Sequence, residues 1–98
     1  MQTTISGPEI LTNQSFKVLV VDDDAVDRML VVRAFKGIDF ETELLEAIDY
    51  ASAISLVNSH QFDCIFVDYR LPDGNGLELV KTLRKQGIHI PIVSLTGQ

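Results

Sequence analysis

The sequence predicts an α/β fold in which parallel strands form a doubly wound sheet. Apolar, β-rich segments alternate with segments of helical periodicity along most of the 98 residues. The connections between them are short, so consecutive strands are expected to be joined by right-handed helical crossovers. With 46% hydrophobic and 22% charged residues, the composition is that of one globular domain with a single core.

The first strand is expected over Phe16–Val21, which is almost entirely apolar and therefore suits a central position in a parallel sheet. A helix is predicted over Ala25–Lys36, with Asp24 as its N-cap and Gly37 at its end. Four of its apolar residues lie at helical spacing and form one stripe: Val26, Met29, Leu30 and Ala34. Three more widen that stripe, so the helix is expected to touch something besides the sheet: Val31, Val32 and Phe35.

The remaining elements continue the alternation of strand and helix. A more polar strand is expected at Glu41–Ala47, towards a sheet edge, and Asp49 is expected to cap the helix that follows it. That helix carries an apolar stripe of Tyr50, Ala53, Ile54 and Val57. The later elements are a buried strand at Phe62–Val67, a helix at Leu77–Gln86 that stops at Gly87, and a short strand at Ile90–Leu95.

Polar side chains follow three of the predicted strands at their carboxyl ends. They are the run Asp22-Asp23-Asp24, then Asp68, then Thr96. Ligands of doubly wound sheets bind outside this end of the strands, so we expect these groups to converge. Adjacent carboxylates repel one another, and Mg²⁺ would remove that penalty while accepting phosphate oxygens as further ligands. Asp68 is a plausible nucleophile towards a phosphoryl group.

Other polar residues have simpler explanations. Asp73 is expected to shape the Pro-Asp-Gly turn through local hydrogen bonds and is not counted as a ligand. His60 and His89 have no partner at ligand spacing, so surface or packing roles are favoured. The single cysteine, Cys64, lies in an apolar run and is expected to be a buried structural thiol.

Three stretches carry a resemblance to a known family. They read Val-Leu-Val-Val-Asp-Asp-Asp at 18–24, Phe-Val-Asp-Tyr-Arg-Leu-Pro-Asp-Gly-Asn-Gly-Leu-Glu-Leu-Val at 66–80, and Pro-Ile-Val-Ser-Leu-Thr-Gly at 91–97. In order, spacing and local context, residues 16–98 resemble the receiver domain of two-component response regulators. The resemblance implies a flavodoxin-like, doubly wound parallel sheet with strand order 2-1-3-4.

The same resemblance implies roles for individual residues. Asp68 would be the phosphoacceptor, and Asp22 and Asp23 would hold Mg²⁺ together with Asp68 and the backbone carbonyl of Arg70. Thr96 would be the switch hydroxyl that turns toward the phosphoryl group. The implied partner is a sensor histidine kinase or a histidine phosphotransfer protein in the cytoplasm. The domain would not be an enzyme, beyond a slow autodephosphorylation.

The resemblance stops early in the family's pattern. Past the threonine the family continues with a helix, a fifth strand preceded by a lysine, and a last helix, for which this sequence has no residues. We therefore expect a flexible leader at 1–15 and an incomplete receiver domain at 16–98. Its last strand would be an open edge beside bare apolar surface, so a homodimer or a domain-swapped oligomer is predicted.

Two further function classes stay open, and two are disfavoured. Besides the phosphoacceptor, the first is a non-phosphorylated interaction module that self-associates. The second is a phosphohydrolase that uses an aspartate nucleophile. Such hydrolases usually carry a second acid two residues after the nucleophile, where this chain has Arg70. A net charge of −6 argues against nucleic-acid binding by this domain, and no apolar run is long enough to span a membrane.

Overall fold

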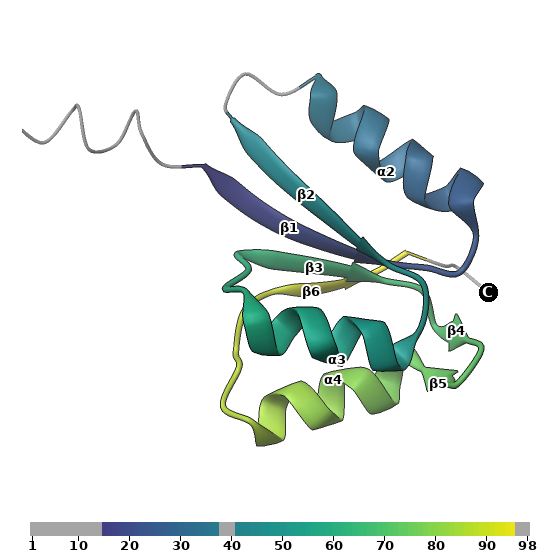
Figure 1. The fold of residues 1–98 in the computed structure, drawn as a ribbon, viewed down its shortest axis with the longest axis vertical. Helices are drawn as coiled ribbons and strands as arrows, with labels where there is room; N and C mark the ends of the chain where they lie inside the picture. Colours follow the sequence, from purple (N-terminus) through teal and green to yellow (C-terminus); the bar gives the residue numbers. More distant parts are fainter. Residues whose placement is uncertain (1–14, 38–40, 96–98) are drawn as a thin grey trace, which may run out of the picture.

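A four-stranded parallel sheet forms the centre of the computed structural model, which describes residues 15–37 and 41–95 (Figure 1). Its strands lie in the order β2-β1-β3-β6. They are β1 (Phe16–Val21), β2 (Thr42–Ala47), β3 (Cys64–Val67) and β6 (Ile92–Ser94). Because β6 is the fourth strand of the main sheet along the chain, the predicted order 2-1-3-4 is confirmed, and the polar strand β2 lies at an edge as expected.

Helices cover both faces of this sheet. Figure 1 shows α2 (Ala25–Lys36) on one face, and α3 (Tyr50–Ser59) and α4 (Gly76–Lys85) together on the other. The longest of these helices has 12 residues, and no helix among the described residues is long and apolar enough to cross a bilayer. Each helix begins where the sequence places a capping side chain: Asp24, Asp49 and Asn75 accept a backbone N–H from Val26, Ser52 and Glu78.

The two central strands are largely buried on both faces, because alternate residues of β1 and β3 contribute to two separate apolar clusters. On the side of α3 and α4, Leu19 and Ile65 pack with Leu79 and Leu83 of α4. On the side of α2, Val18 and Val20 pack with Cys64. Cys64 is a free, buried thiol, which confirms its predicted structural place, and desolvation by burial raises its pKa.

Helix α2 packs through a different face from the one the sequence suggested. The predicted stripe is exposed, with Val26 and Leu30 each 58% accessible and Met29 43% accessible. Val31 and Phe35, which were expected to widen the stripe, instead pack on the sheet, where the Phe35 ring meets the Phe66 ring edge-on at 5.5 Å between centroids. Both patterns have helical spacing, so periodicity alone did not distinguish them.

A small second sheet was not anticipated. The segment expected to be a plain turn contains the antiparallel strands β4 (Arg70–Leu71) and β5 (Gly74–Asn75), in which Arg70 pairs with Asn75 and Leu71 with Gly74. Figure 1 shows this hairpin beyond the carboxyl end of β3. The buried Leu71 side chain belongs to the cluster under α3 and α4, which explains why the turn is ordered.

Two leucines of α4 test how much the packing of this helix contributes to stability. Leu83 is fully buried and Leu77 is 51% exposed. We expect Leu83→Ala to lower the free energy of unfolding by about 2–5 kcal/mol, because it removes buried methyl groups and leaves a cavity. Leu77→Ala in the same helix should change it by less than about 1 kcal/mol. Urea denaturation followed by circular dichroism measures both, and equal losses would contradict the packing described.

Candidate functional site

Three aspartates meet at the carboxyl ends of the two central strands. Asp22 follows β1 and Asp68 follows β3, and the parallel register pairs Val21 with Val67, so the two acids are carried side by side. One carboxylate oxygen from each of Asp22, Asp23 and Asp68 lies within 4.8 Å of the others. The structure therefore brings together the acidic residues that the sequence predicted to converge. Thr96, the fourth predicted member, lies outside the described residues.

Asp22 is the most buried of the three, with 2% of its surface exposed. Its Oδ1 accepts the backbone N–H of Asp24 at 2.9 Å. Burial raises the pKa of Asp22 above its usual 3.8; the Asp24 N–H opposes this shift, and the negative charges of Asp68, Asp27 and Asp23 add to it. The protein therefore holds a carboxylate where its charge is unfavourable.

The turn from β1 into α2 separates the roles of neighbouring aspartates. Asp24 caps α2 through the Val26 N–H at 2.8 Å, as predicted, while Asp23 is left exposed beside Asp22. Arg28, for which no role was predicted, donates from Nη1 to the backbone carbonyl of Asp22 at 2.7 Å. Its Nε also donates to Glu46 at the end of β2, at 2.8 Å. Arg28 thus ties the acidic turn to the neighbouring strand.

Asp68 is half-buried and sits at the start of a tightly folded return segment. Its backbone N–H donates to the carbonyl of Val21 at 2.9 Å, which extends the β1–β3 ladder by one residue. The chain then passes through the β4–β5 hairpin and returns at Gly76, whose N–H donates to the carbonyl of Tyr69 at 2.7 Å. A Cβ on Gly76 would lie 2.9 Å from the carbonyl oxygen of Asp68. Only a glycine allows the chain to approach this closely.

Besides a local contact with its own backbone N–H, Asp73 forms hydrogen bonds to residues far along the chain, which the sequence analysis did not predict. Its Oδ1 accepts the N–H of Tyr50 at 2.7 Å and its Oδ2 accepts the N–H of Ala51 at 3.0 Å, across 23 and 22 residues of sequence. These bonds, the Tyr50 N–H foremost, lower its pKa below 3.8. Arg70 starts β4 with an exposed side chain, and the ligand role predicted for its carbonyl stays a prediction.

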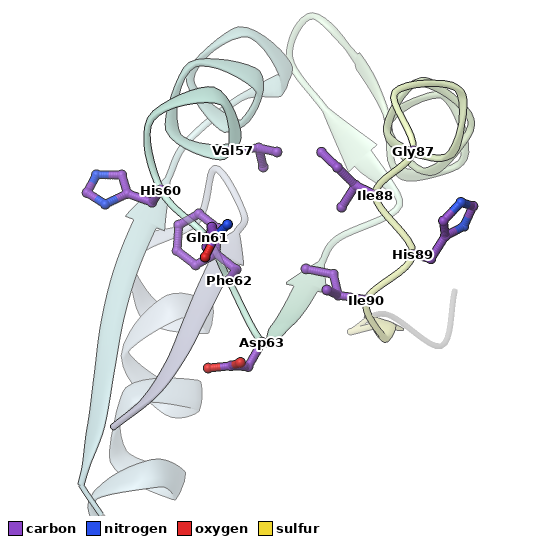
Figure 2. Close-up of a pocket in the computed structure, with 9 residues that line it drawn as sticks. All are labelled: Val57, His60, Gln61, Phe62, Asp63, Gly87, Ile88, His89 and Ile90. Carbon is purple, nitrogen blue, oxygen red and sulfur yellow. The ribbon is translucent and has the colours of Figure 1, made fainter. Parts of the chain in front are cut away.

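The two histidines lie at the opposite end of the sheet. They border a cavity of about 360 Å³ whose apolar wall includes Phe62 and Ile88. Figure 2 shows the imidazoles of His60 and His89 pointing away from this cavity and away from each other. His60 Nδ1 is 2.9 Å from Lys17 Nζ, and its ring contacts Phe62. The packing role predicted for His60 is therefore confirmed, while His89 is exposed.

Comparisons with known proteins agree with this arrangement. The family model of the response regulator receiver domain matches residues 18–98. The phosphate regulon transcriptional regulatory protein PhoB of Klebsiella pneumoniae is 36% identical over 84 residues, which cover 84% of this chain and 36% of PhoB. The chain thus spans about a third of the length of that relative. Chemotaxis protein CheY-3 of Vibrio cholerae is 27% identical over 92 residues, covering 92% of this chain and 70% of CheY-3.

A solved structure shows the same likeness. The MaeR response regulator, in a structure bound to beryllium trifluoride, superposes with a TM-score of 0.73 at 26% identity. The match covers 85% of this chain and 68% of that one.

The raised pKa of Asp22 predicts how stability depends on pH when no metal is bound. Between pH 3.8 and the raised pKa, the folded state holds more protons than the unfolded state, so the free energy of unfolding falls as pH rises through that window. Asp22→Asn keeps the acceptor for the Asp24 N–H and removes this penalty. We expect the substitution to stabilise the metal-free protein at pH 7 by about 1 kcal/mol.

Urea denaturation between pH 3 and pH 8 in the presence of a chelator measures this effect. Asp63→Asn removes the same charge from an exposed position at the other end of β3, keeps the acceptor for the Lys17 N–H, and should change stability by less than about 0.5 kcal/mol. An Asp22→Asn variant that is less stable than the parent at neutral pH would refute the assignment.

The close approach at Gly76 predicts a penalty for any side chain there. Gly76→Ala should lower the free energy of unfolding by about 1–3 kcal/mol, although alanine favours helices, because the new Cβ overlaps backbone atoms. Gly37→Ala is the matched control, since its Cβ would meet nothing nearer than the Ala34 carbonyl at 3.8 Å. The same urea titration compares the two, and equal effects would contradict the geometry at Asp68.

Proposed function

The chain belongs to the family of response regulator receiver domains, and we propose that it accepts a phosphoryl group on Asp68 in two-component signalling. The observation that carries the proposal is the convergence of Asp22, Asp23 and Asp68 within 4.8 Å at the carboxyl edge of the sheet. Ligands of doubly wound folds bind at that edge.

Asp68 is the residue suited to act as the nucleophile. It is half-buried, so one side of its carboxylate is open to a donor, and its backbone is held between Val21 and Gly76. One carboxylate oxygen would attack phosphorus and form an acyl phosphate, while the bond from phosphorus to the donor breaks. With acetyl phosphate as donor, the leaving group is acetate, which carries away the electron pair of the broken P–O bond.

The acidic cluster has the donor set of a magnesium site. The ion pairs of the described residues join Lys17 to Glu43 and Arg28 to Glu46, so none of them neutralises Asp22, Asp23 or Asp68. Hard oxygen donors with unneutralised charge suit Mg²⁺, and the backbone carbonyl of Arg70 would complete the protein's share of the ligands. When bound, the ion supplies compensation for charge that develops on the phosphoryl oxygens.

Partners and later steps follow from the same proposal. The donor would be a sensor histidine kinase or a histidine phosphotransfer protein in the cytoplasm, and Thr96 would offer its hydroxyl to the phosphoryl group. Slow loss of the phosphoryl group to water would be the only reaction the domain carries out itself. The activity of any longer protein that contains this domain is a further proposal, as are its own partners.

A phosphohydrolase remains the second candidate in chemical terms, but the structure favours it less. The position two residues after Asp68 is Arg70, whose side chain is exposed at the start of β4. This sequence position therefore lacks the acid with which such hydrolases activate water against the acyl phosphate.

Phosphorylation is tested with acetyl phosphate and Mg²⁺, followed by intact-protein mass spectrometry. The parent chain should gain one phosphoryl group, and Asp68→Asn should gain none because the nucleophile is absent. Asp63→Asn is the matched control, since Asp63 lies at the other end of β3, where its carboxylate accepts the Lys17 N–H. A chelator should suppress the gain, because the three carboxylates are then uncompensated.

The alternative outcomes are distinct. A parent chain that neither gains mass nor binds beryllium trifluoride would support the interaction-module hypothesis. Continued release of inorganic phosphate over many turnovers would support the hydrolase.

A further inference from the structure

The first N–H groups of α3 are shared between two carboxylates from different parts of the chain. Asp49, the residue before the helix, accepts the N–H of Ser52 at 2.8 Å. Asp73, which is distant in sequence, accepts the N–H groups of Tyr50 and Ala51. These groups have no partner within the helix itself. Asp73 therefore supplies hydrogen-bond acceptors to the N-terminus of α3 from a distant part of the chain.

Asp73 also lies at the tip of the β4–β5 hairpin, in the turn that connects Leu71 to Gly74. Gly74 lies against the Tyr50 ring, since a Cβ there would be 3.4 Å from Cδ2 of that ring. The Tyr50 hydroxyl in turn bonds Thr82 of α4 at 2.5 Å. The hairpin tip, α3 and α4 are thus joined around one tyrosine.

The other end of this hairpin leads directly to the acidic cluster. Arg70 follows Asp68 by two residues, and β5 ends at Asn75, directly before Gly76, which lies against the Asp68 carbonyl. The segment 69–76 is therefore fixed at both ends beside Asp68 and at its tip on α3.

We propose that Asp73 is a positioning residue for the phosphoacceptor site, because its bonds to α3 hold the 69–76 segment, and with it the Arg70 carbonyl and Asp68, in place. This inference rests on the proposed function. Positioning groups outside the ligand set often change metal affinity strongly when removed. The lowered pKa of Asp73 agrees with an ionised group facing the positive end of a helix.

Asp49 supplies the matched control because it serves the same helix end without touching the hairpin. Asp73→Ala should raise the dissociation constant for Mg²⁺ about tenfold, measured by an NMR titration of backbone amides. It should also speed hydrogen exchange at the Gly76 amide about tenfold in the absence of metal, because the return segment loosens. Asp49→Ala should weaken α3 but leave both quantities within about twofold of the parent.

Asp73→Asn tests the same inference with a smaller change. It keeps one acceptor oxygen for the Tyr50 N–H, so both effects should be intermediate between those of the parent and Asp73→Ala. This variant also decides the question if Asp73→Ala does not fold.

The two proposals fail in different ways. Parent protein that does not bind Mg²⁺ would refute the metal site, while the exchange rates at Gly76 would still decide the role of Asp73. If Asp73→Ala and Asp49→Ala change the Gly76 exchange rate equally, or neither changes it, Asp73 is only a helix cap and the inference is wrong.

Discussion

The parallel pairing of β1 and β3 is the constraint on which the rest of the structure depends. Their register aligns Val21 with Val67, so the next residues, Asp22 and Asp68, leave the sheet side by side. The same strands are almost wholly inaccessible to solvent, with Val18, Leu19, Val20 and Val21 all at 0% exposure. A rigid apolar sheet thus holds two acids close together, although their charges repel.

Asp22 combines a cost to stability with a place in the proposed site. Asp22 is buried, and its pKa is raised chiefly by desolvation. The carboxylate opposes folding when no cation is bound, and the same carboxylate belongs to the proposed magnesium site. The proposed magnesium site therefore contains a locally unfavourable charge that the surrounding packing tolerates.

Much of this could be predicted from the sequence, for identifiable reasons. The strands are short apolar runs that end at aspartates, and their order followed from a resemblance that covers most of the chain. The packing face of α2 could not be predicted, because Val26 and Leu30 repeat at the same spacing as Val31 and Phe35. Only the position of Phe66 on the sheet decides between the two faces.

The role of Asp73 was missed for a different reason. Local turn chemistry explains most aspartates in Pro-Asp-Gly segments, and nothing near Asp73 in the sequence points to Tyr50. The hydrogen bond exists because β4 and β5 carry the aspartate to a helix that begins 23 residues earlier in the chain. The long-range partners of exposed polar groups depend on tertiary structure. They cannot be predicted from local sequence patterns.

The closed N-terminus of α3 has a consequence for anion selectivity. Free N–H groups at the start of a helix form a natural cradle for phosphate or sulfate. In α3 the N–H groups of Tyr50, Ala51 and Ser52 are already taken by carboxylates of the chain itself. A phosphate-bearing molecule would therefore be repelled by two carboxylates at this helix end and would have none of these three N–H groups to bind. The N-terminus of α3 is therefore not expected to compete with the proposed phosphoacceptor site for a phosphate-bearing donor.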